Sequence, residues 1–221
     1  MTMTNVAVAP ASADIPPRSA TLPTLQVTVA VGTPPGVTSA LADREQRATW
    51  APGEGRVEMF AYRDLVIRLA RGAGIRDDRA DDLLAARYAI ELHRPDPFYD
   101  WTAPTVSTAA EAFSAIVVNR MDPEHSGRVA ALFGDLDASD FPSRMGTRSR
   151  QVYSFAPDRY LHVQDLGEAD GLDVIDGAWR DADPRFVRIC EDLTPLVPAY
   201  DDTCVSHEDH LAERVFLRTQ S

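Results

Sequence analysis

The chain has 221 residues and a formal net charge of −12 at pH 7. This acidity argues against a nucleic-acid-binding surface, which needs clustered Lys and Arg. All 22 basic residues are arginine, and without a lysine amine the chain cannot form the Schiff bases of iminium aldolases or PLP enzymes. No stretch approaches the ~18 apolar residues of a membrane span, and the N-terminus lacks the features of a secretory signal. We therefore expect a cytoplasmic protein.

The N-terminal part of the chain divides into two segments. Residues 1–56 are rich in Pro, Ala, Thr and Gly, which predicts a flexible extension, although LQVTVAV at 25–31 has the alternation of a strand. Residues 57–104 are predicted to contain a helical hairpin, followed by the aromatic stretch FYDWTAP. The apolar residues with helical spacing are Met59, Tyr62, Val66 and Leu69 in the first helix, and Leu84, Tyr88 and Leu92 in the second.

Strand and helix patterns alternate through residues 112–221, the predicted main domain. Strand patterns occupy 113–118, 147–155, 159–166 and 212–219, and helix patterns occupy 129–136, 172–179 and 186–193. The order β-α-β-β-α-β, with a split second helix, predicts an α+β, ferredoxin-like antiparallel sheet with its helices on one face. The other face of such a sheet needs a cover, and we expect a face-to-face homodimer of the dimeric α+β barrel type.

Two arginines and a histidine occupy neighbouring strands of the predicted hairpin. Arg148 and Arg150 are two residues apart, so a regular strand points both to one face, and His162 lies one strand away. Histidine suits proton transfer near neutral pH, and a fixed arginine charge would stabilise an enolate or phenolate oxygen. Two alternatives stay open: a lone histidine is more often a structural one, and arginines on an edge strand can simply oppose aggregation.

Other polar residues carry weaker signals. Asp137 ends a predicted helix, where a carboxylate opposes the helix dipole, and this favours a role elsewhere. His207 and His210 lack the i, i+4 spacing of a zinc-binding helix, so we expect a solvated turn and no metal site. The sequence contains no Gly-rich phosphate loop and no cysteine cluster, and we predict that the protein uses no cofactor.

Residues 112–221 resemble the tetracenomycin-type polyketide cyclases of bacterial aromatic polyketide pathways. The resemblance rests on RMDPEH at 120–125, LDASDFPSRMGTRSRQVYSF at 136–155, RYLHVQD at 159–165, DADPRF at 181–186 and LVPAYDD at 196–202. It implies a dimeric ferredoxin-like fold and closure of a later ring by intramolecular aldol condensation and dehydration, without a cofactor. The implied substrate is an aromatic polyketide intermediate of a type II synthase, and the acyl carrier protein or synthase subunits are further implied partners.

The resemblance also points to site residues. Asp137, Arg150 and His162 fall where the family places its proposed active-site polar groups. Relatives often have a histidine immediately before the aspartate, where this chain has Leu136, so His162 would have to do the work of that histidine. We expect the substrate to lie between helices and sheet, bound by Arg148, Phe133, Tyr153, Tyr160 and Trp179.

The N-terminal part resembles the family less clearly. MFAYRDLVIRL at 59–69 is similar to the opening strand of the family, and FYDWTAP is similar to its closing segment. Residues 57–104 are therefore either a helical hairpin or an incomplete cyclase-like segment, and the hairpin is our prediction.

Two other functions stay open. A cofactorless monooxygenase acting on an anthrone-like ring would use a related scaffold and would consume oxygen. A non-catalytic assembly or chaperone subunit of the synthase would dock through its N-terminal part. In that case, deletion of residues 1–104 should abolish function and leave the C-terminal domain folded.

Overall fold

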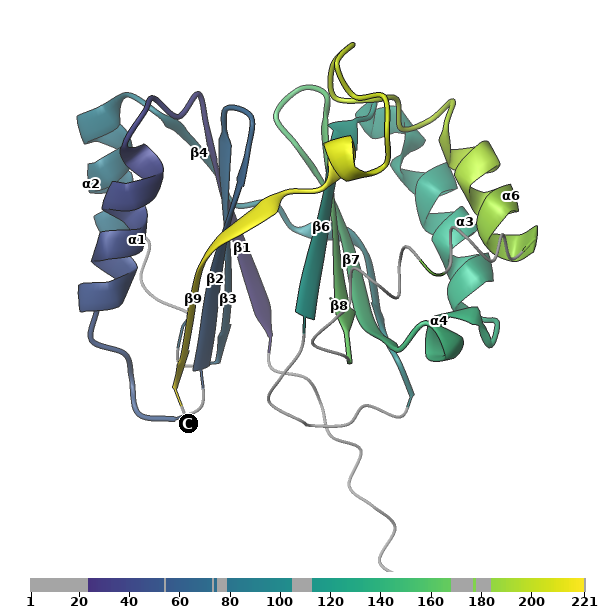
Figure 1. The fold of residues 1–221 in the computed structure, drawn as a ribbon, viewed down its shortest axis with the longest axis horizontal. Helices are drawn as coiled ribbons and strands as arrows, with labels where there is room; N and C mark the ends of the chain where they lie inside the picture. Colours follow the sequence, from purple (N-terminus) through teal and green to yellow (C-terminus); the bar gives the residue numbers. More distant parts are fainter. Residues whose placement is uncertain are drawn as a thin grey trace, which may run out of the picture.

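The computed structural model of the protein describes residues 24–53, 55–72, 74, 79–104, 113–167, 177 and 184–220. Its layers follow the order helices, sheet, sheet, helices (Figure 1). The N-terminal half of the chain supplies one helical layer and most of the sheet beside it, and the C-terminal half supplies the other helical layer and sheet. The two sheets therefore face each other, and the helices cover their outer sides.

Both halves begin with the same order of elements, β-α-β-β-α, so the ferredoxin-like arrangement occurs twice. The N-terminal half contains β1 (Leu25–Val31), α1 (Val37–Arg47), β2 (Gly55–Tyr62), β3 (Leu65–Gly72), α2 (Arg79–Tyr88) and β4 (Glu91–His93). The C-terminal half contains β6 (Phe113–Arg120), the 3-10 helix η1 (Pro123–His125), α3 (Ser126–Asp137), α4 (Phe141–Arg144), β7 (Thr147–Phe155), β8 (Arg159–Leu166), α6 (Pro184–Leu193) and η2 (Glu208–His210). The ferredoxin-like prediction for the C-terminal half is confirmed.

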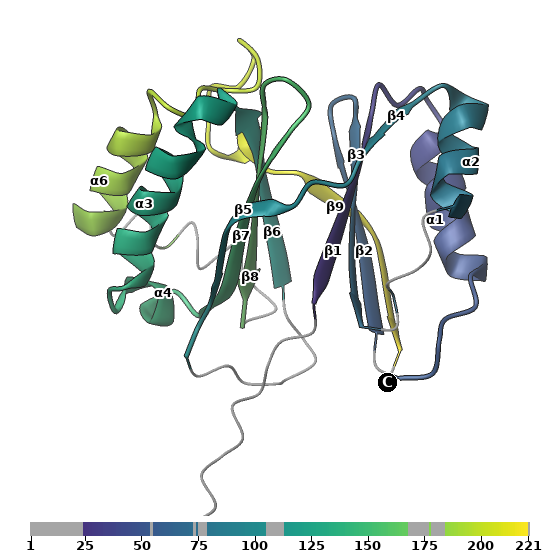
Figure 2. The ribbon, with the colours of Figure 1, turned by 180° about the vertical axis from the view of Figure 1, so that it is seen from behind.

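Each half contributes one strand to the sheet of the other. β5 (Pro97–Thr102) follows the N-terminal half but pairs antiparallel with β7, so that Trp101 lies opposite Arg150. β9 (Glu213–Gln220) crosses in the other direction and pairs with β2. The crossing of β9 is visible in Figure 1, and that of β5 in Figure 2. The strand orders are β4-β1-β3-β2-β9 and β5-β7-β8-β6.

Large apolar side chains fill the space between the two sheets. The cluster includes Phe60, Tyr62, Ile67, Ile116, Tyr153 and Leu161. Burial of a side chain of this size stabilises the fold by roughly 1.5–3 kcal/mol. The N-terminal half thus covers the sheet face that the sequence analysis assigned to a second copy of the chain.

A buried ionic network also joins the two sheets. Nη2 of Arg71 in β3 donates to both carboxylate oxygens of Asp165 in β8, at 2.8 Å each. Glu58 in β2 accepts from Arg71 and from Ser114 in β6, and its side chain is fully buried. A second hydroxyl, that of Ser149, donates to Asp165 at 2.9 Å. These bonds satisfy groups that would otherwise be buried without partners.

The predicted first helix of the hairpin at 59–69 is wrong. These residues form β2 and β3, joined by a tight turn at Arg63, whose φ is +52°. The first six residues of β3 are all buried, because one face meets the helices and the other meets the opposite sheet. A strand buried on both faces loses its two-residue alternation, and the helical spacing of Met59 and Leu69 was accidental. The second predicted helix is present as α2, but it ends at Tyr88, and Leu92, which was predicted to continue its apolar stripe, lies in β4.

The predicted flexible extension is wrong for residues 25–47. They form β1, which pairs with β3 along its whole length, and α1. The alternation in LQVTVAV therefore did indicate a strand. Residues 1–23, and the helix predicted over 172–179 apart from residue 177, lie outside the described residues. None of the helices in the described ranges is long and apolar enough to cross a membrane.

Candidate functional site

Three of the predicted site residues meet on the helix-covered face of the C-terminal sheet. Asp137 is the last residue of α3, Arg150 lies in β7 and His162 lies in β8. Nε of Arg150 is 3.0 Å from Oδ2 of Asp137, and its Nη1 is 2.9 Å from Nε2 of His162. The three residues are only 6%, 3% and 9% exposed. They form one continuous polar line in a buried environment.

Arg150 is the centre of this line. Its Nη1 also lies 3.3 Å from Oε1 of Gln164, whose amide donates to the hydroxyl of Thr147 at 2.9 Å. The carboxylate of Asp137 balances the guanidinium charge, which a buried arginine requires. Within the described part of the chain, Nη2 of Arg150 makes no hydrogen bond. This nitrogen is the donor left for an oxygen atom of a bound molecule.

The hydrogen bond to Arg150 fixes the state of His162. A guanidinium can only donate, so Nε2 of His162 accepts and the proton of the neutral imidazole sits on Nδ1. Burial, and then the charge of Arg150, holds the pKa of His162 well below its usual range. His162 is therefore neutral near pH 7, with its basic lone pair occupied by Arg150.

Aromatic rings enclose the polar line. The ring centroid of Phe133 in α3 lies 4.8 Å from Cζ of Arg150 and 5.0 Å from the ring of His162. The ring of Tyr160 in β8 lies 6.5 Å from that of His162. Both Phe133 and Tyr160 belong to the apolar cluster between this sheet and its helices. Such rings offer flat apolar surfaces beside the polar groups, which suits an aromatic ligand.

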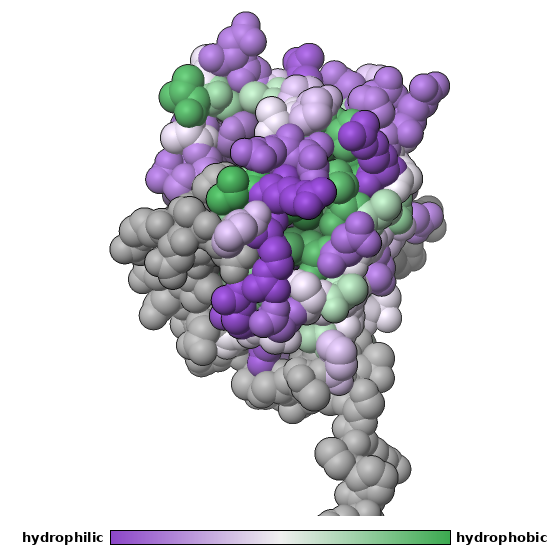
Figure 3. All heavy atoms as spheres, turned by 90° about the vertical axis from the view of Figure 1, so that its right-hand side faces the viewer, coloured by the Kyte–Doolittle hydropathy of each residue, from purple (hydrophilic) through white to green (hydrophobic). Residues whose placement is uncertain are grey.

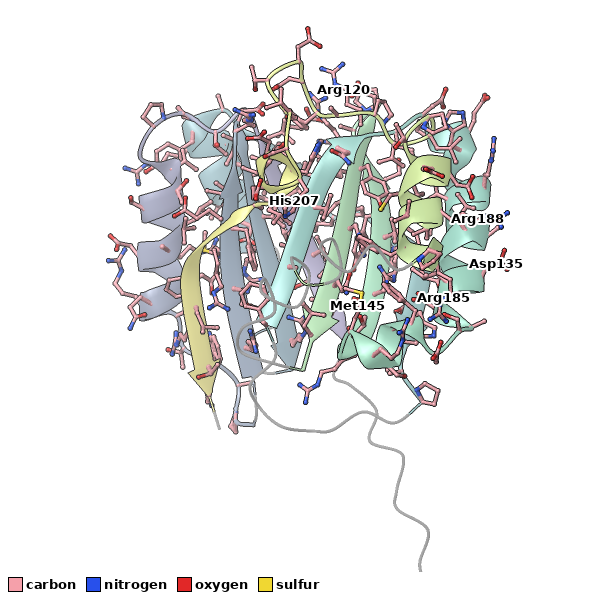
Figure 4. All side chains as sticks on the ribbon, turned by 45° about the vertical axis from the view of Figure 1, so that its right-hand side comes forward. Arg120, Asp135, Met145, Arg185, Arg188 and His207 are labelled. Atoms are coloured by element: carbon pink, nitrogen blue, oxygen red, sulfur yellow. The ribbon has the colours of Figure 1, made fainter. Side chains whose placement is uncertain are left out.

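The register of α3 decides which of its acids faces the sheet. Val129, Phe133 and Asp137 are spaced four residues apart and are buried, whereas Asp135 is exposed. Figure 4 shows Asp135 on the outer side of the helical layer. Apolar side chains are also visible between hydrophilic ones on this outer face (Figure 3). A substitution of the exposed Asp135 is therefore a matched control for a substitution of the buried Asp137.

Tyr153, predicted to bind the substrate, is not part of this site. It belongs to the apolar cluster between the sheets, because it lies three positions after Arg150 and strand alternation sends the two side chains to opposite faces. This part of the prediction is wrong.

The structure interrupts the regular strand alternation on which the sequence analysis relied for Arg148 and Arg150. The register of β7 against β8 shifts between Thr147 and Ser149, so simple alternation does not relate the two arginines. The side chain of Arg148 is buried and packs near Gly167. Trp179, the remaining predicted substrate contact, lies outside the described residues.

The two histidines of the HEDH motif lie near η2 and do not approach this site. Nδ1 of His210 is 2.5 Å from Oδ1 of Asn119. In the described ranges, no three His, Cys, Asp or Glu side chains gather into a group that could hold a metal ion.

Sequence reasoning missed Tyr99 and did not assign Gln164 to the site. Tyr99 lies in β5, and its hydroxyl donates to Oδ2 of Asp137 at 2.8 Å. The aromatic stretch FYDWTAP was a signal, but the sheet that β5 joins could not be read from the sequence. Gln164 shares a strand face with His162, and that spacing could have identified it.

The N-terminal half has a different residue at the matching position. Arg68 is the fourth residue of β3, as His162 is the fourth of β8. Nε of Arg68 lies 2.9 Å from Oε1 of Glu45 in α1, and both side chains are buried. A cavity of about 20 Å³ beside them is lined by Thr28 and Met59 among others. This half therefore has a buried ion pair where the other half has a titratable imidazole.

Comparison with known proteins concerns mainly the C-terminal half. The family model for polyketide synthesis cyclase matches residues 113–219. The tetracenomycin F2 cyclase of Streptomyces glaucescens is 31% identical over 103 residues, which are 46% of this chain and 90% of that protein. The chain belongs to the polyketide synthesis cyclase family. The family segment contains Asp137, Arg150 and His162, whereas Tyr99 precedes it.

Solved structures of other proteins extend the likeness. A structure of the tetracenomycin F2 cyclase of Streptomyces glaucescens, described as a type-II polyketide cyclase, is 26% identical and covers 49% of this chain and 98% of its own, with a TM-score of 0.44. The structure of an anthrone oxidase-like protein covers 88% of this chain and 92% of its own, with a TM-score of 0.52 and 11% identity. At that identity the second match shows a shared fold, which spans both halves of this polyketide cyclase family member.

Proposed function

We propose that the protein closes a later ring of an aromatic type II polyketide intermediate by intramolecular aldol condensation and dehydration. The observation that carries this proposal is the buried line of Asp137, Arg150 and His162 inside the family segment. It combines a neutral base, a fixed cation and a carboxylate in one apolar enclosure. These are the groups that enolate chemistry requires.

The first step is removal of a proton from an activated methylene of the substrate. His162 is the base, and it can accept the proton on Nε2 only after Arg150 stops donating to that nitrogen. A carbonyl oxygen of the substrate would draw Arg150 away from His162, because this oxygen attracts the guanidinium more strongly as it becomes an enolate. Binding of the substrate thus releases the base and stabilises the oxyanion with the same side chain.

Ring closure follows within the bound chain. The enolate carbon attacks a ketone carbonyl of the same molecule, a carbon–carbon bond forms, and the new alkoxide takes the proton from His162. Loss of a second proton and of hydroxide then gives a double bond and one molecule of water. The sum of these steps is loss of water from the substrate, with no change in oxidation state.

Orientation can contribute more to the rate than proton transfer does. A poly-ketone is flexible, and holding its reacting carbons together can lower the barrier by roughly 7–11 kcal/mol. Phe133 and Tyr160 provide flat surfaces against which rings that have already formed can lie. The polar side chains of the site (Asp137, Arg150, His162 and Gln164) are nine-tenths or more buried. A substrate therefore enters only when the packing of the helices on this sheet opens.

The test is co-incubation of the purified protein with a minimal type II polyketide synthase, with free and carrier-bound intermediates compared. We expect a new product lighter by one water, formed equally well without oxygen. A product that gains oxygen would indicate a monooxygenase instead. An unchanged product pattern with higher yield would indicate an assembly subunit of the synthase.

A variant separates chemistry from shape. Changing His162→Ala should lower the cyclisation rate by roughly 10²–10⁴-fold, the usual contribution of general base catalysis. His207→Ala, at η2, is the control and should keep the rate. Full rate and an unchanged ring pattern in His162→Ala would mean that the enclosure alone directs the reaction.

A further inference from the structure

Tyr99 reaches the candidate site from outside the family segment. It lies in β5, the strand that follows the N-terminal half and forms the edge of the C-terminal sheet. Its register partner is Val152 of β7, which is in turn opposite His162 of β8. A side chain from one half of the chain is therefore placed over the polar line of the other half.

Two contacts hold Tyr99 in place. Its ring centroid lies 5.9 Å from that of Phe133, and its hydroxyl donates to Oδ2 of Asp137 at 2.8 Å. The same oxygen accepts from Nε of Arg150 at 3.0 Å. Asp137 is thus held from two sides, and the hydrogen bonds run without interruption from Tyr99 to His162.

We propose that Tyr99 is a positioning residue, whose hydroxyl fixes the carboxylate of Asp137 and thereby positions the guanidinium of Arg150, the group that would stabilise the substrate oxyanion. The proposal rests on the proposed function for its kinetic consequence. Asp137 is attached to the end of a helix, and its carboxylate can rotate about the bond to Cβ. Nε of Arg150 contacts both carboxylate oxygens, at 3.2 and 3.0 Å, and the hydroxyl of Tyr99 contacts Oδ2. Two donors from different strands therefore restrain the plane of the carboxylate together, and loss of the Tyr99 donor would leave it less restrained.

The protonation of Tyr99 agrees with a donor role. Burial, and then the hydrogen bond to Asp137, raises the pKa of the Tyr99 phenol. The hydroxyl therefore keeps its proton at neutral pH and donates to the carboxylate. A phenylalanine at this position would keep the ring contact with Phe133 and lose only this bond, which makes Tyr99→Phe the informative substitution.

The first experiment does not depend on any enzymatic activity. The protein is labelled with ¹³C at the phenol carbon of tyrosine, and the Tyr99 resonance is assigned by its loss in Tyr99→Phe. We expect Asp137→Asn to shift this resonance and Asp135→Asn, on the exposed side of the same helix, to leave it unchanged. A Tyr99 resonance that ignores Asp137→Asn would overturn the proposal.

The same samples test the connection to His162. With labelled histidine, Tyr99→Phe should shift the ring signals of His162, because Arg150 no longer holds one position. Tyr88→Phe, in α2 of the N-terminal half, should leave them in place. Unchanged His162 signals in a folded Tyr99→Phe protein would overturn the positioning role.

The kinetic experiment uses the cyclisation assay. Tyr99→Phe should lower kcat by roughly 10–100-fold, the size of a hydrogen bond to a charged group, and change KM by less than about twofold, because a positioning residue acts on the transition state. An unchanged kcat in an otherwise active protein would count against the proposal alone. If the unaltered protein forms no new product, the proposed function fails while the resonance shifts still decide the role of Tyr99.

Discussion

Asp137 occupies a position that is unfavourable for an acid on its own helix. A carboxylate at the C-terminal end of a helix opposes the dipole, which costs about 0.3–1 kcal/mol, and this one is also buried. The hydrogen bonds from Arg150 and Tyr99 offset both costs. The contacts with Arg150 and Tyr99 therefore stabilise this carboxylate, and the dipole of α3 does not.

His162 should make the folding stability depend on pH. Its folded-state pKa is well below the value near 6.5 that it has when unfolded. Between these two values the unfolded chain binds one more proton, so the free energy of unfolding rises with pH up to about 6.5 and is then flat. The slope due to this residue should approach about 1.4 kcal/mol per pH unit.

Urea unfolding between about pH 5 and about pH 7.5 measures this dependence. In His162→Gln, the free energy of unfolding should rise less steeply with pH below about pH 6.5, by about 1.4 kcal/mol per pH unit. The other histidines contribute equally to both proteins. Parallel stability curves for the two proteins would mean that His162 is not held neutral in the folded state.

At the scale of single residues, much of the site could be predicted from local pattern. Asp137 was predicted to end a helix and to have a role beyond that helix, and the strand hairpin placed Arg150 near His162. Tyr153 was misplaced although its alternation relative to Arg150 was visible, because the two faces of β7 are both buried and look alike in composition. Tyr99 depends on a strand exchange between halves, which local spacing does not encode.

At the scale of elements, burial on both faces explains where prediction succeeded and failed. β7 and β8 were located correctly because turn residues bound them on both sides. β2 and β3 were mistaken for a helix because the sheet between two layers leaves β3 with no polar face. The apolar run of β3 is explained as a strand only when the layers that cover its two faces are known.

The ion pair between Arg71 and Asp165 should be important for holding the two sheets together. Both side chains are about nine-tenths buried, so Asp165→Ala would remove the shorter carboxylate contacts of Arg71 and leave it with its longer contact to Glu58, at 3.3 Å. We expect the free energy of unfolding to fall by about 3–5 kcal/mol, measured by urea denaturation.

Two controls accompany this measurement. Asp158→Asn removes an acid whose side chain is 42% exposed and should change stability by no more than about 0.5 kcal/mol. The double change of Arg71→Met with Asp165→Leu should recover most of the loss, because no charge is then buried alone. A loss below about 1 kcal/mol for Asp165→Ala, as in exposed ion pairs, would contradict the buried role of the pair.

At the scale of the whole molecule, one chain contains the face-to-face sheets that were expected from two copies. The apolar cluster and the ionic network between the sheets belong to a single chain. A second copy is therefore not needed to cover this face, and only the C-terminal half has a histidine at the fourth position of its central strand. We expect light scattering to give the mass of one chain, and a mass of two chains would show that another surface pairs.

Because both sheets belong to one chain, a deletion of residues 1–104 would also alter the C-terminal half. Removing residues 1–104 would take away β5 with Tyr99 and would expose the sheet face that carries Tyr153. Loss of function after that deletion is expected for an enzyme as well as for an assembly subunit. Product analysis discriminates between the two, and truncation does not.

Because β5 and β9 are exchanged between the two halves, the chain could be divided into two fragments that would still pair with each other. A cut in the backbone between Pro104 and Phe113 would produce two fragments, each still threaded by one strand into the sheet of the other. One fragment would carry Tyr99, and the other would carry Asp137, Arg150 and His162. Neither fragment contains the whole site, so activity would require the two fragments to associate and could be used to measure that association.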